Sequence, residues 1–390
     1  MSTGLPRVEV SINPNNIGNT LQTEDDIAAM VLTGVSVSGK IQQGEPTLLI
    51  SLADAESKGI TEIGSNSYAY SQIQHFYNEA VDGAKLWVML VASSVTMEDM
   101  VDKDNNHAKA LLANANPPIK LLAISRKASG TVTLANGLDA DVDKAIIKAQ
   151  ELAEYFLPEY KECSIIVDAK NFNGKHSDLK DYNATTNAPY VTAFIGSVGG
   201  SKNAAVGLYL GRLAKDPVQR NPAHVKTGSL AIEGASFTSG LPIAETDFLD
   251  AIHNKGFAFF RTITGKAGYY FSDAQTCAQT NTDLNSITLV RVITKARLLA
   301  YKVFVEEILE EIPVNENGQL PQVLVKAWEA KIETAITQQM IAKGEASGVV
   351  ININSNQDII GTSSIAVTLK IQPVGYARYI NISLGFTKTI

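Results

Sequence analysis

The stretch of sequence best suited to chemistry is a glycine-rich segment, Gly196-Ser-Val-Gly-Gly-Ser-Lys202-Asn203, which lies between an apolar run and an amphipathic run. In a phosphate-binding loop, such a segment joins a strand to a helix, and its backbone N–H groups face the anion. The required pattern is G-x-x-x-x-G-K-[ST], but here Ser201 precedes the lysine and Asn203 replaces the hydroxyl residue that would hold Mg²⁺. The sequence therefore favours a plain strand-to-helix turn, and a nucleotide-binding α/β enzyme using the Gly196–Lys202 loop is the alternative.

Other reactive residue types do not gather into a recognisable pattern. The histidines are scattered, and no two of them have the i, i+4 spacing of a helical zinc site. Asp168 ends an apolar run and could act as an acidic magnesium partner, but any α/β fold offers such an aspartate. No G-x-S-x-G nucleophile motif occurs, and the two cysteines have no obvious activating partners. We therefore expect no catalytic residue, no metal site and no cofactor. The residues considered are His75, His107, His176, His224, His253, Cys163 and Cys277.

Composition limits the class of protein further. The chain has 390 residues, 45% of them apolar and 19% charged, which is typical of a globular protein of two or three domains. The net charge of −7 argues against a general nucleic-acid binder. The N-terminus lacks the features of a signal peptide, and no stretch reaches the ~18 apolar residues of a membrane span. We expect a protein made and folded in the bacterial cytoplasm, with no nucleic-acid partner and no direct membrane insertion.

The elements that would position any site alternate along the first two thirds of the chain. Continuous apolar runs separated by amphipathic helices indicate a largely parallel sheet with helices on its faces. The predicted strands are residues 47–52, 85–92, 120–125, 164–168, 190–196 and 257–263, and the predicted helices are 68–81, 142–156, 203–214 and 245–254.

The last third of the chain has a different character. Two long helical patterns, 283–311 and 320–343, precede three strand patterns at 349–353, 365–371 and 379–386. We therefore predict an α/β part followed by an α+β part. The predicted domains are an N-terminal linker arm at 1–22, an N-terminal region at 23–100, an α/β domain at 101–262, and a C-terminal domain at 263–390 that ends in a strand arm.

Both ends of the chain have the pattern of lone strands. Apolar and polar residues alternate with period two near each terminus, and no hairpin turn joins either run to a neighbour. A strand needs ladder partners, so these ends pair with distant parts of their own fold or with another subunit. The apolar positions are Leu5, Val8, Val10 and Ile12 at the start and Ile380, Ile382, Leu384 and Phe386 at the end, and Pro14 and Gly18 suit a hinge after the first run.

The helical pattern at 283–311 has an unusual distribution of charge. Its first part is basic, and its last turns contain Glu306, Glu307, Glu310 and Glu311, which oppose the helix dipole. One interpretation is a solvated face with weak i, i+4 pairs, and the other is a surface that registers a charged partner. The basic residues are Arg291, Lys295, Arg297 and Lys302.

Several segments together resemble the contractile tail sheath proteins of phages, R-type pyocins and type VI-like injection systems. Residues 45–92 are similar to the early block of that family, with the apolar strand after Pro46, a helix carrying aromatic residues, and a second apolar strand. Residues 204–230 resemble its Ala-rich helix that leads through Pro-Ala to a Gly. The strongest likeness is the order of Phe260-Arg261-Thr262, the helix with Arg291, the helix with Trp328 and the terminal strands.

This resemblance implies a subtilisin-like middle domain without a protease triad, a C-terminal α+β domain, and terminal arms that complete the sheets of neighbouring subunits. It implies stacked hexameric rings around an inner tube, which contract to drive the tube through a target envelope. The implied partners are further copies of the chain, the inner tube protein, and baseplate and tail terminator proteins. The mature location would be a virion tail or injection-system particle. The basic residues of helix 283–311, with Lys326 and Lys331, are the candidates to face the tube.

Overall fold

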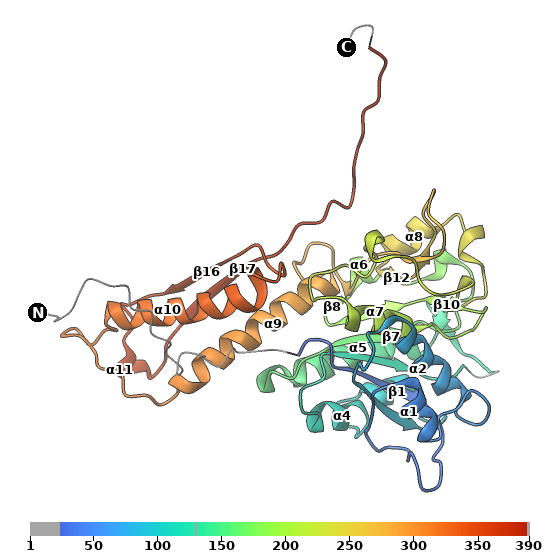
Figure 1. Ribbon diagram of the computed structural model, residues 1–390, viewed down its shortest axis with the longest axis horizontal. Coiled ribbons are helices and arrows are strands. Elements are labelled where there is room, and N and C mark those ends of the chain that lie inside the picture. Colours follow the sequence, from blue (N-terminus) through green and yellow to red (C-terminus); the bar gives the residue numbers. More distant parts are fainter. Residues whose placement is uncertain (1–23, 129–130, 388–390) are drawn as a thin grey trace, which may run out of the picture.

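The buried apolar runs between residues 28 and 258 assemble into one seven-stranded sheet. The computed structural model describes residues 24–128 and 131–387, and Figure 1 shows a large rounded lobe joined through α9 to an elongated lobe. The strand order of the sheet is β12-β9-β7-β4-β1-β3-β2, and every adjacent pair is parallel except β2 with β3. The expected parallel sheet is therefore confirmed.

The strands of this sheet are β1 (Ala28–Thr33), β2 (Thr47–Leu49), β3 (Leu86–Val91), β4 (Leu121–Ser125), β7 (Ser164–Asp168), β9 (Val191–Phe194) and β12 (Phe257–Ala258). The short pairs around it are β5 (Leu134–Ala135) with β6 (Leu138–Asp139), β8 (Asn187–Ala188) with β15 (Cys277–Ala278), β10 (Gly196–Val198) with β11 (Ala235–Phe237), and β13 (Phe260–Arg261) with β14 (Tyr270–Phe271). Every residue of β1, β4 and β7 is buried, as expected for parallel strands covered on both faces.

The helices of the large lobe are α1 (Leu52–Ser57), α2 (Ser67–Glu79), α3 (Met97–Val101), α4 (Ala108–Asn114), α5 (Asp141–Tyr155), α6 (Tyr182–Thr185), α7 (Val206–Lys215) and α8 (Leu249–Asn254). Helices α2 and α7 pack especially closely because α7 carries glycine at two positions one turn apart. A Cβ atom on Gly207 would lie 2.0 Å from the Gln72 carbonyl oxygen, and one on Gly211 would lie 2.5 Å from that of Phe76. Only glycine allows this approach.

The large lobe has one hydrophobic core, and this differs from the expected domain boundaries. β1 pairs with both β3 and β4, so residues 23–100 and 101–262 share a single sheet. The same core continues past residue 263 through Ala274 and Cys277 to Ile287, because β15 pairs with β8. The change from one lobe to the other therefore falls within α9.

The elongated lobe consists of α9 (Ile287–Phe304), α10 (Gln322–Ile336) with a π-helical turn at Thr337–Ile341, the short α11 (Ile359–Thr362), and the antiparallel pair β16 (Gly348–Ile353) and β17 (Val367–Gln372). Its core is small and lies between the two long helices and the inward face of the hairpin. Helix α9 ends at Phe304, before the four glutamates that the sequence pattern included in it. Carboxylates at a helix C-terminus oppose the helix dipole, and this favours ending α9 before the glutamates.

None of the helices within residues 24–128 and 131–387 combines the length and the apolar character needed to cross a membrane.

Candidate assembly surfaces

The glycine-rich turn uses its polar groups within the chain. Gly199 and Gly200 adopt φ values of +65° and +70°, which glycine tolerates without strain. The Ser197 hydroxyl donates to the Ser201 carbonyl oxygen, and the Lys202 ammonium donates to the Ser239 carbonyl oxygen. This lysine therefore bonds to a neighbouring loop, whereas the lysine of a nucleotide-binding loop would face a phosphate group.

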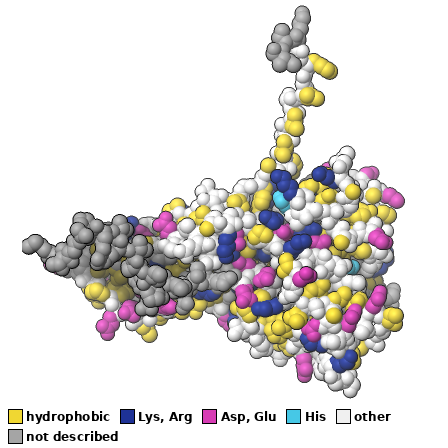
Figure 2. All heavy atoms as spheres, viewed as in Figure 1, with side chains coloured by type: hydrophobic (Ala, Val, Ile, Leu, Met, Phe, Trp, Pro, Cys, Tyr) yellow, Lys and Arg dark blue, Asp and Glu magenta, His cyan; other side chains and the backbone are white. Residues whose placement is uncertain are grey.

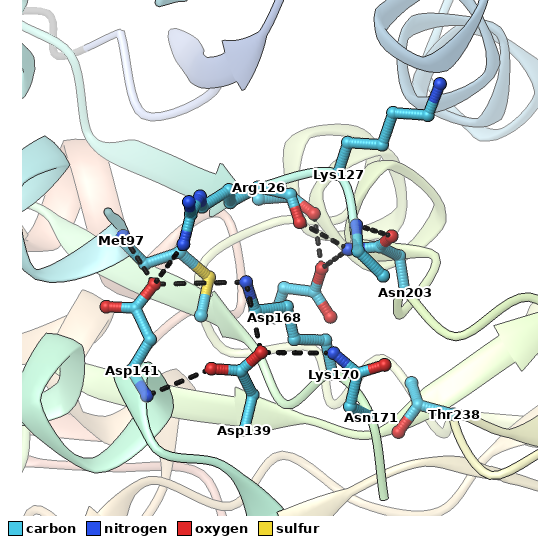
Figure 3. Close-up of polar contacts among 12 residues, drawn as sticks. Met97, Arg126, Lys127, Asp139, Asp141, Asp168, Lys170, Asn171, Asn203 and Thr238 are labelled. Atoms are coloured by element: carbon cyan, nitrogen blue, oxygen red, sulfur yellow. Dashed lines mark hydrogen bonds and ion pairs between the residues drawn. The ribbon is translucent and has the colours of Figure 1, made fainter. Parts of the chain in front are cut away.

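Asp168 at the carboxyl end of β7 is fully buried, and its carboxylate accepts hydrogen bonds from three donors, of which Figure 3 labels Asn203. Asn203 Nδ2 lies 2.6 Å from it, the Ala204 N–H lies 2.7 Å from it, and the Ser125 hydroxyl also donates to it. Burial raises the pKa of Asp168 to about 6, against the opposing effect of these hydrogen bonds. The aspartate therefore locks the Asn203 turn onto the sheet, and the alternative of a magnesium partner loses its support.

A second polar group beside Asp168 fixes the neighbouring loops. The buried Lys170 ammonium lies 3.6 Å from Asp139 and 3.9 Å from Asp141, and Figure 3 shows these side chains pointing toward one another. Asp141 also accepts from the Met97 and Glu98 N–H groups at 2.7 and 3.0 Å, so it caps α3. All of these contacts are structural.

The remaining candidates for chemistry are buried or isolated. Burial raises the pKa of both Cys163 and Cys277 to about 12, so neither thiol is a ready nucleophile. Within the described residues, no three His, Cys, Asp or Glu side chains gather where they could hold a metal ion.

Three of the basic residues expected to face a partner instead hold the subunit together. Arg291 and Lys295 are only 6% and 3% exposed, and they lie against Asp25, Asp216 and Glu345. The expectation of a partner-facing surface is therefore wrong for these two residues. The physical reason is that α9 enters the large lobe at this point, so its basic face meets buried acids of the same chain.

Arg297 has a similar role at the next turn of α9. Its guanidinium pairs with the buried Glu162, donates to the Leu157 carbonyl oxygen at 2.7 Å, and lies 4.3 Å from the centre of the Tyr160 ring. These contacts join α9 to the segment that follows α5, so the guanidinium is mainly occupied within the subunit.

The other three basic candidates lie further out on the elongated lobe. Lys326 pairs with Glu329 on its own helix and Lys331 pairs with Glu307, with lysine side chains that are 72% and 53% exposed. Lys302 is partly exposed near the end of α9. These positions stay predictions for a partner-facing surface.

The last fifteen described residues form the most unusual surface of the molecule. After β17 the chain runs along the large lobe as far as Arg378 and then leaves the body in an extended conformation (Figure 1). The apolar side chains expected to form one strand face are Ile380, Ile382, Leu384 and Phe386, and their exposed fractions are 76%, 83%, 94% and 112%. Figure 2 shows these side chains spaced along the projecting segment, clear of the rest of the molecule.

Residues 379–386 are therefore not a strand within this subunit. No strand of the described residues pairs with them. Exposed apolar side chains are unfavourable in water. The unpaired backbone groups of an extended segment are a template for pairing, and a partner strand would cover both.

Two residues fix the base of this segment, and the sequence analysis missed them. The Tyr376 hydroxyl donates to the Gln219 carbonyl oxygen, and the Arg378 guanidinium lies 3.0 Å from the Asp273 carboxylate. An aromatic and a basic residue directly before a lone strand pattern are a usable signal for such an anchor.

The β16–β17 hairpin has strand edges of the kind with which an extended segment pairs. Its six residue pairs run from Gly348 opposite Gln372 to Ile353 opposite Val367, and alternate residues pack against α9 and α10. Among the described residues each of the two strands has one partner, so each has an edge available for pairing. The positions Leu5, Val8, Val10 and Ile12 of the N-terminal run, and Pro14 and Gly18 of the hinge, lie outside the described residues.

The fold resembles those of contractile sheath proteins of known structure. The chain resembles a subunit of the helical sheath of the anti-feeding prophage in its contracted state, with a TM-score of 0.65, 14% identity and coverage of 99% of this chain and 100% of that one. It also resembles a chain of the contracted sheath complex of the extracellular contractile injection system PVC, at a TM-score of 0.59, 14% identity and coverage of 100% and 99%. A sheath tail protein from Listeria innocua matches at a TM-score of 0.54, with 10% identity and coverage of 92% and 94%.

Two sequence models of one protein family match the chain. The model described as DUF2586, N-terminal domain, matches residues 5–275, and the one described as DUF2586, C-terminal domain, matches residues 283–390. The chain belongs to the DUF2586 family. No curated protein matches it.

Proposed function

We propose that this protein is the structural subunit of a contractile sheath, which polymerises as stacked hexameric rings around an inner tube. On contraction, the sheath drives the tube through a target envelope. The observation that carries the proposal is the projecting segment 379–387, whose apolar face is bare in the single subunit. The similarity in fold over the whole length to sheath subunits supports the same function.

The arms act by adding strands to neighbours. Residues 379–386 of one subunit pair with an edge of the β16–β17 sheet of another, and the N-terminal run at residues 5–12 extends the same kind of sheet. Backbone hydrogen bonds give strength to such a joint, and the alternating side chains fix its register. Each contact joins two different surfaces of identical subunits, so the contacts generate rings and helical stacks.

The large lobe is the rigid body that the arms connect. It corresponds to a subtilisin-like middle domain without a triad, and its polar clusters serve structure alone. The exposed residues Lys302, Lys326 and Lys331 of the elongated lobe face the inner tube. Baseplate and tail terminator proteins close the two ends of the sheath, which is assembled in the bacterial cytoplasm and matures into a virion tail or an injection-system particle.

The experiment that tests this function compares a triple variant of the full chain with a double control variant. Changing Ile380, Ile382 and Leu384 together to serine removes the apolar face of the arm, and we expect a folded monomer that no longer sediments as polymer. The matched control changes Asn381 and Ser383 to alanine on the opposite face and should assemble like the wild type. Equal assembly of the serine variant and the control would contradict the proposal.

A further inference from the structure

The bases of the two terminal arms lie at one junction between the lobes. Asp25 lies just before β1, where the N-terminal arm enters the fold, and Tyr376 lies just before the projecting C-terminal segment. These residues are at opposite ends of the sequence, yet both reach the same surroundings of α9 and of the loop that follows α7.

The N-terminal base is held by two basic side chains of α9. The Lys295 ammonium lies 2.6 Å from the Asp25 carboxylate and 2.6 Å from that of Glu345, between α10 and β16. Arg291 Nη2 donates to the Asp25 carbonyl oxygen at 3.4 Å and to the Asp216 carbonyl oxygen at 3.3 Å. Arg291 therefore connects the base of the N-terminal arm to the loop after α7.

The C-terminal base is held by the other end of the same loop. The Tyr376 hydroxyl donates to the Gln219 carbonyl oxygen, three residues after Asp216. Arg378 pairs with Asp273, and Asn221 Nδ2 lies 2.6 Å from the same carboxylate. Residues 216–221 thus contact both arm bases, and Val218 between them packs into the core of the elongated lobe.

The centre of the junction, around Arg291, Lys295 and Asp216, is buried. It encloses a cavity of only about 20 Å³, which is room for one water molecule, lined by Asp25, Lys295 and Arg291 among others. Arg291 Nη1 has no hydrogen-bond partner within the part of the chain that the structure describes. Removing one member of a buried ionic group leaves an uncompensated charge, so opening such a junction is costly.

We propose that Arg291 and the 216–221 loop couple the two arm bases into one force-transmitting unit. A pull on the N-terminal arm passes from Asp25 through Arg291 to Asp216, along the loop to Gln219, and through Tyr376 into the C-terminal arm. The mechanical role rests on the proposed sheath function, whereas the coupling itself is a property of the single subunit.

Hydrogen exchange on the full-length monomer tests the coupling. Tyr376→Phe removes one hydroxyl at the C-terminal base, and because energetic coupling is reciprocal it should also loosen the N-terminal base. We expect about fivefold faster exchange of the amides at residues 25–28, the effect of losing roughly one net hydrogen bond. Tyr379→Phe is the matched control, because that ring is 83% exposed and lies beyond the anchored base, and exchange at 25–28 should keep its wild-type rate.

A second variant tests the same coupling at Arg291. Arg291→Lys keeps the charge, but the lysine side chain is shorter and does not reach the position of Nη2, the atom that donates to both carbonyl oxygens. We therefore expect faster exchange at 25–28 and at 374–378 together. Unchanged exchange at 25–28 in Tyr376→Phe, or a response of only one base to Arg291→Lys, would overturn the coupling. These measurements need no polymer, so their failure leaves the sheath function standing. If the wild-type protein never polymerised, the proposed sheath function would be refuted, and the coupling within the subunit would still stand.

Discussion

The two lobes differ in how completely the backbone hydrogen-bonding groups of their strands are paired within the subunit. The large lobe closes a seven-stranded sheet under helices, and its strands β1, β4 and β7 are buried along their whole length. The elongated lobe has a two-stranded sheet and then sends an unpaired strand pattern into solvent. The large lobe pairs its strands within the subunit, and we propose that neighbouring subunits complete the elongated lobe.

This difference shows where stability and assembly are located. Buried apolar area stabilises a lobe whether or not a partner is present, whereas an exposed strand gains its hydrogen bonds only on association. Substitutions in the large lobe should therefore change unfolding, and substitutions in the arm should change assembly.

The largest effect on stability should come from the junction that joins the lobes. Lys295→Met removes the cation between Asp25 and Glu345, and both carboxylates lie within 2.6 Å of it. We expect a loss of about 3–5 kcal/mol in the free energy of unfolding, because the buried Glu345 carboxylate loses its cation. Urea denaturation measures this loss, and a change below about 1 kcal/mol would mean that the lobes are joined by other contacts.

Close helix packing should make the large lobe nearly as sensitive. Gly207→Ala places a methyl group 2.0 Å from the Gln72 carbonyl oxygen, so α2 and α7 must separate. We expect destabilisation of about 3 kcal/mol, measured by thermal or urea unfolding. Gly234→Ala is the matched control, since its Cβ would meet nothing within 4 Å, and it should change stability by less than about 0.5 kcal/mol. Equal effects of the two substitutions would refute the packing account.

A smaller, pH-dependent effect should come from Asp168. Its pKa in the folded protein is about 6, above the roughly 3.9 of an unfolded chain. The folded state therefore binds the proton more tightly, and this contribution to stability is present at low pH and is lost as the pH rises through 6. Between pH 7 and pH 5, wild type should gain about 1 kcal/mol relative to Asp168→Asn. Parallel curves for the two proteins would show that the aspartate keeps an ordinary pKa.

The smallest effect on stability is expected at the exposed lysines of the elongated lobe. Lys326→Ala and Lys331→Ala break pairs at the surface and should each change the free energy of unfolding by less than about 0.5 kcal/mol. Binding of the subunit to isolated inner tubes should nevertheless weaken in a co-sedimentation assay, because these residues are proposed to face the tube. Unchanged tube binding would show that Lys326 and Lys331 do not belong to the surface that faces the tube.

The sequence predicted the large lobe best. Runs such as Leu121–Ser125 and Ser164–Asp168 are continuous and apolar, and a buried parallel strand gives that pattern directly. The two long helices and the hairpin strands were also predictable from their periods. The end of α9 was not, because periodicity continues through Glu306 and Glu307 although the dipole disfavours them there.

Burial of charged residues was the main feature that periodicity could not supply. Lys295 appears in the sequence as one of several basic residues on a helix, and its partners Asp25 and Glu345 lie on distant elements. A charge pattern states which residues are charged and gives no information on what faces them. The alternation from Ile380 to Phe386 without a neighbouring strand is itself visible in the sequence, and the role of these residues as an intersubunit arm stays a prediction.

The central claim is that the elongated lobe is completed by a neighbouring subunit. Electron cryo-microscopy of the assembled wild-type protein tests it most directly, by tracing the chain beyond Arg378. We predict hollow striated cylinders in which residues 379–386 cross to a neighbour and pair as a strand with its β16–β17 sheet. Discrete globular particles, or a segment that folds back onto its own subunit, would contradict the account.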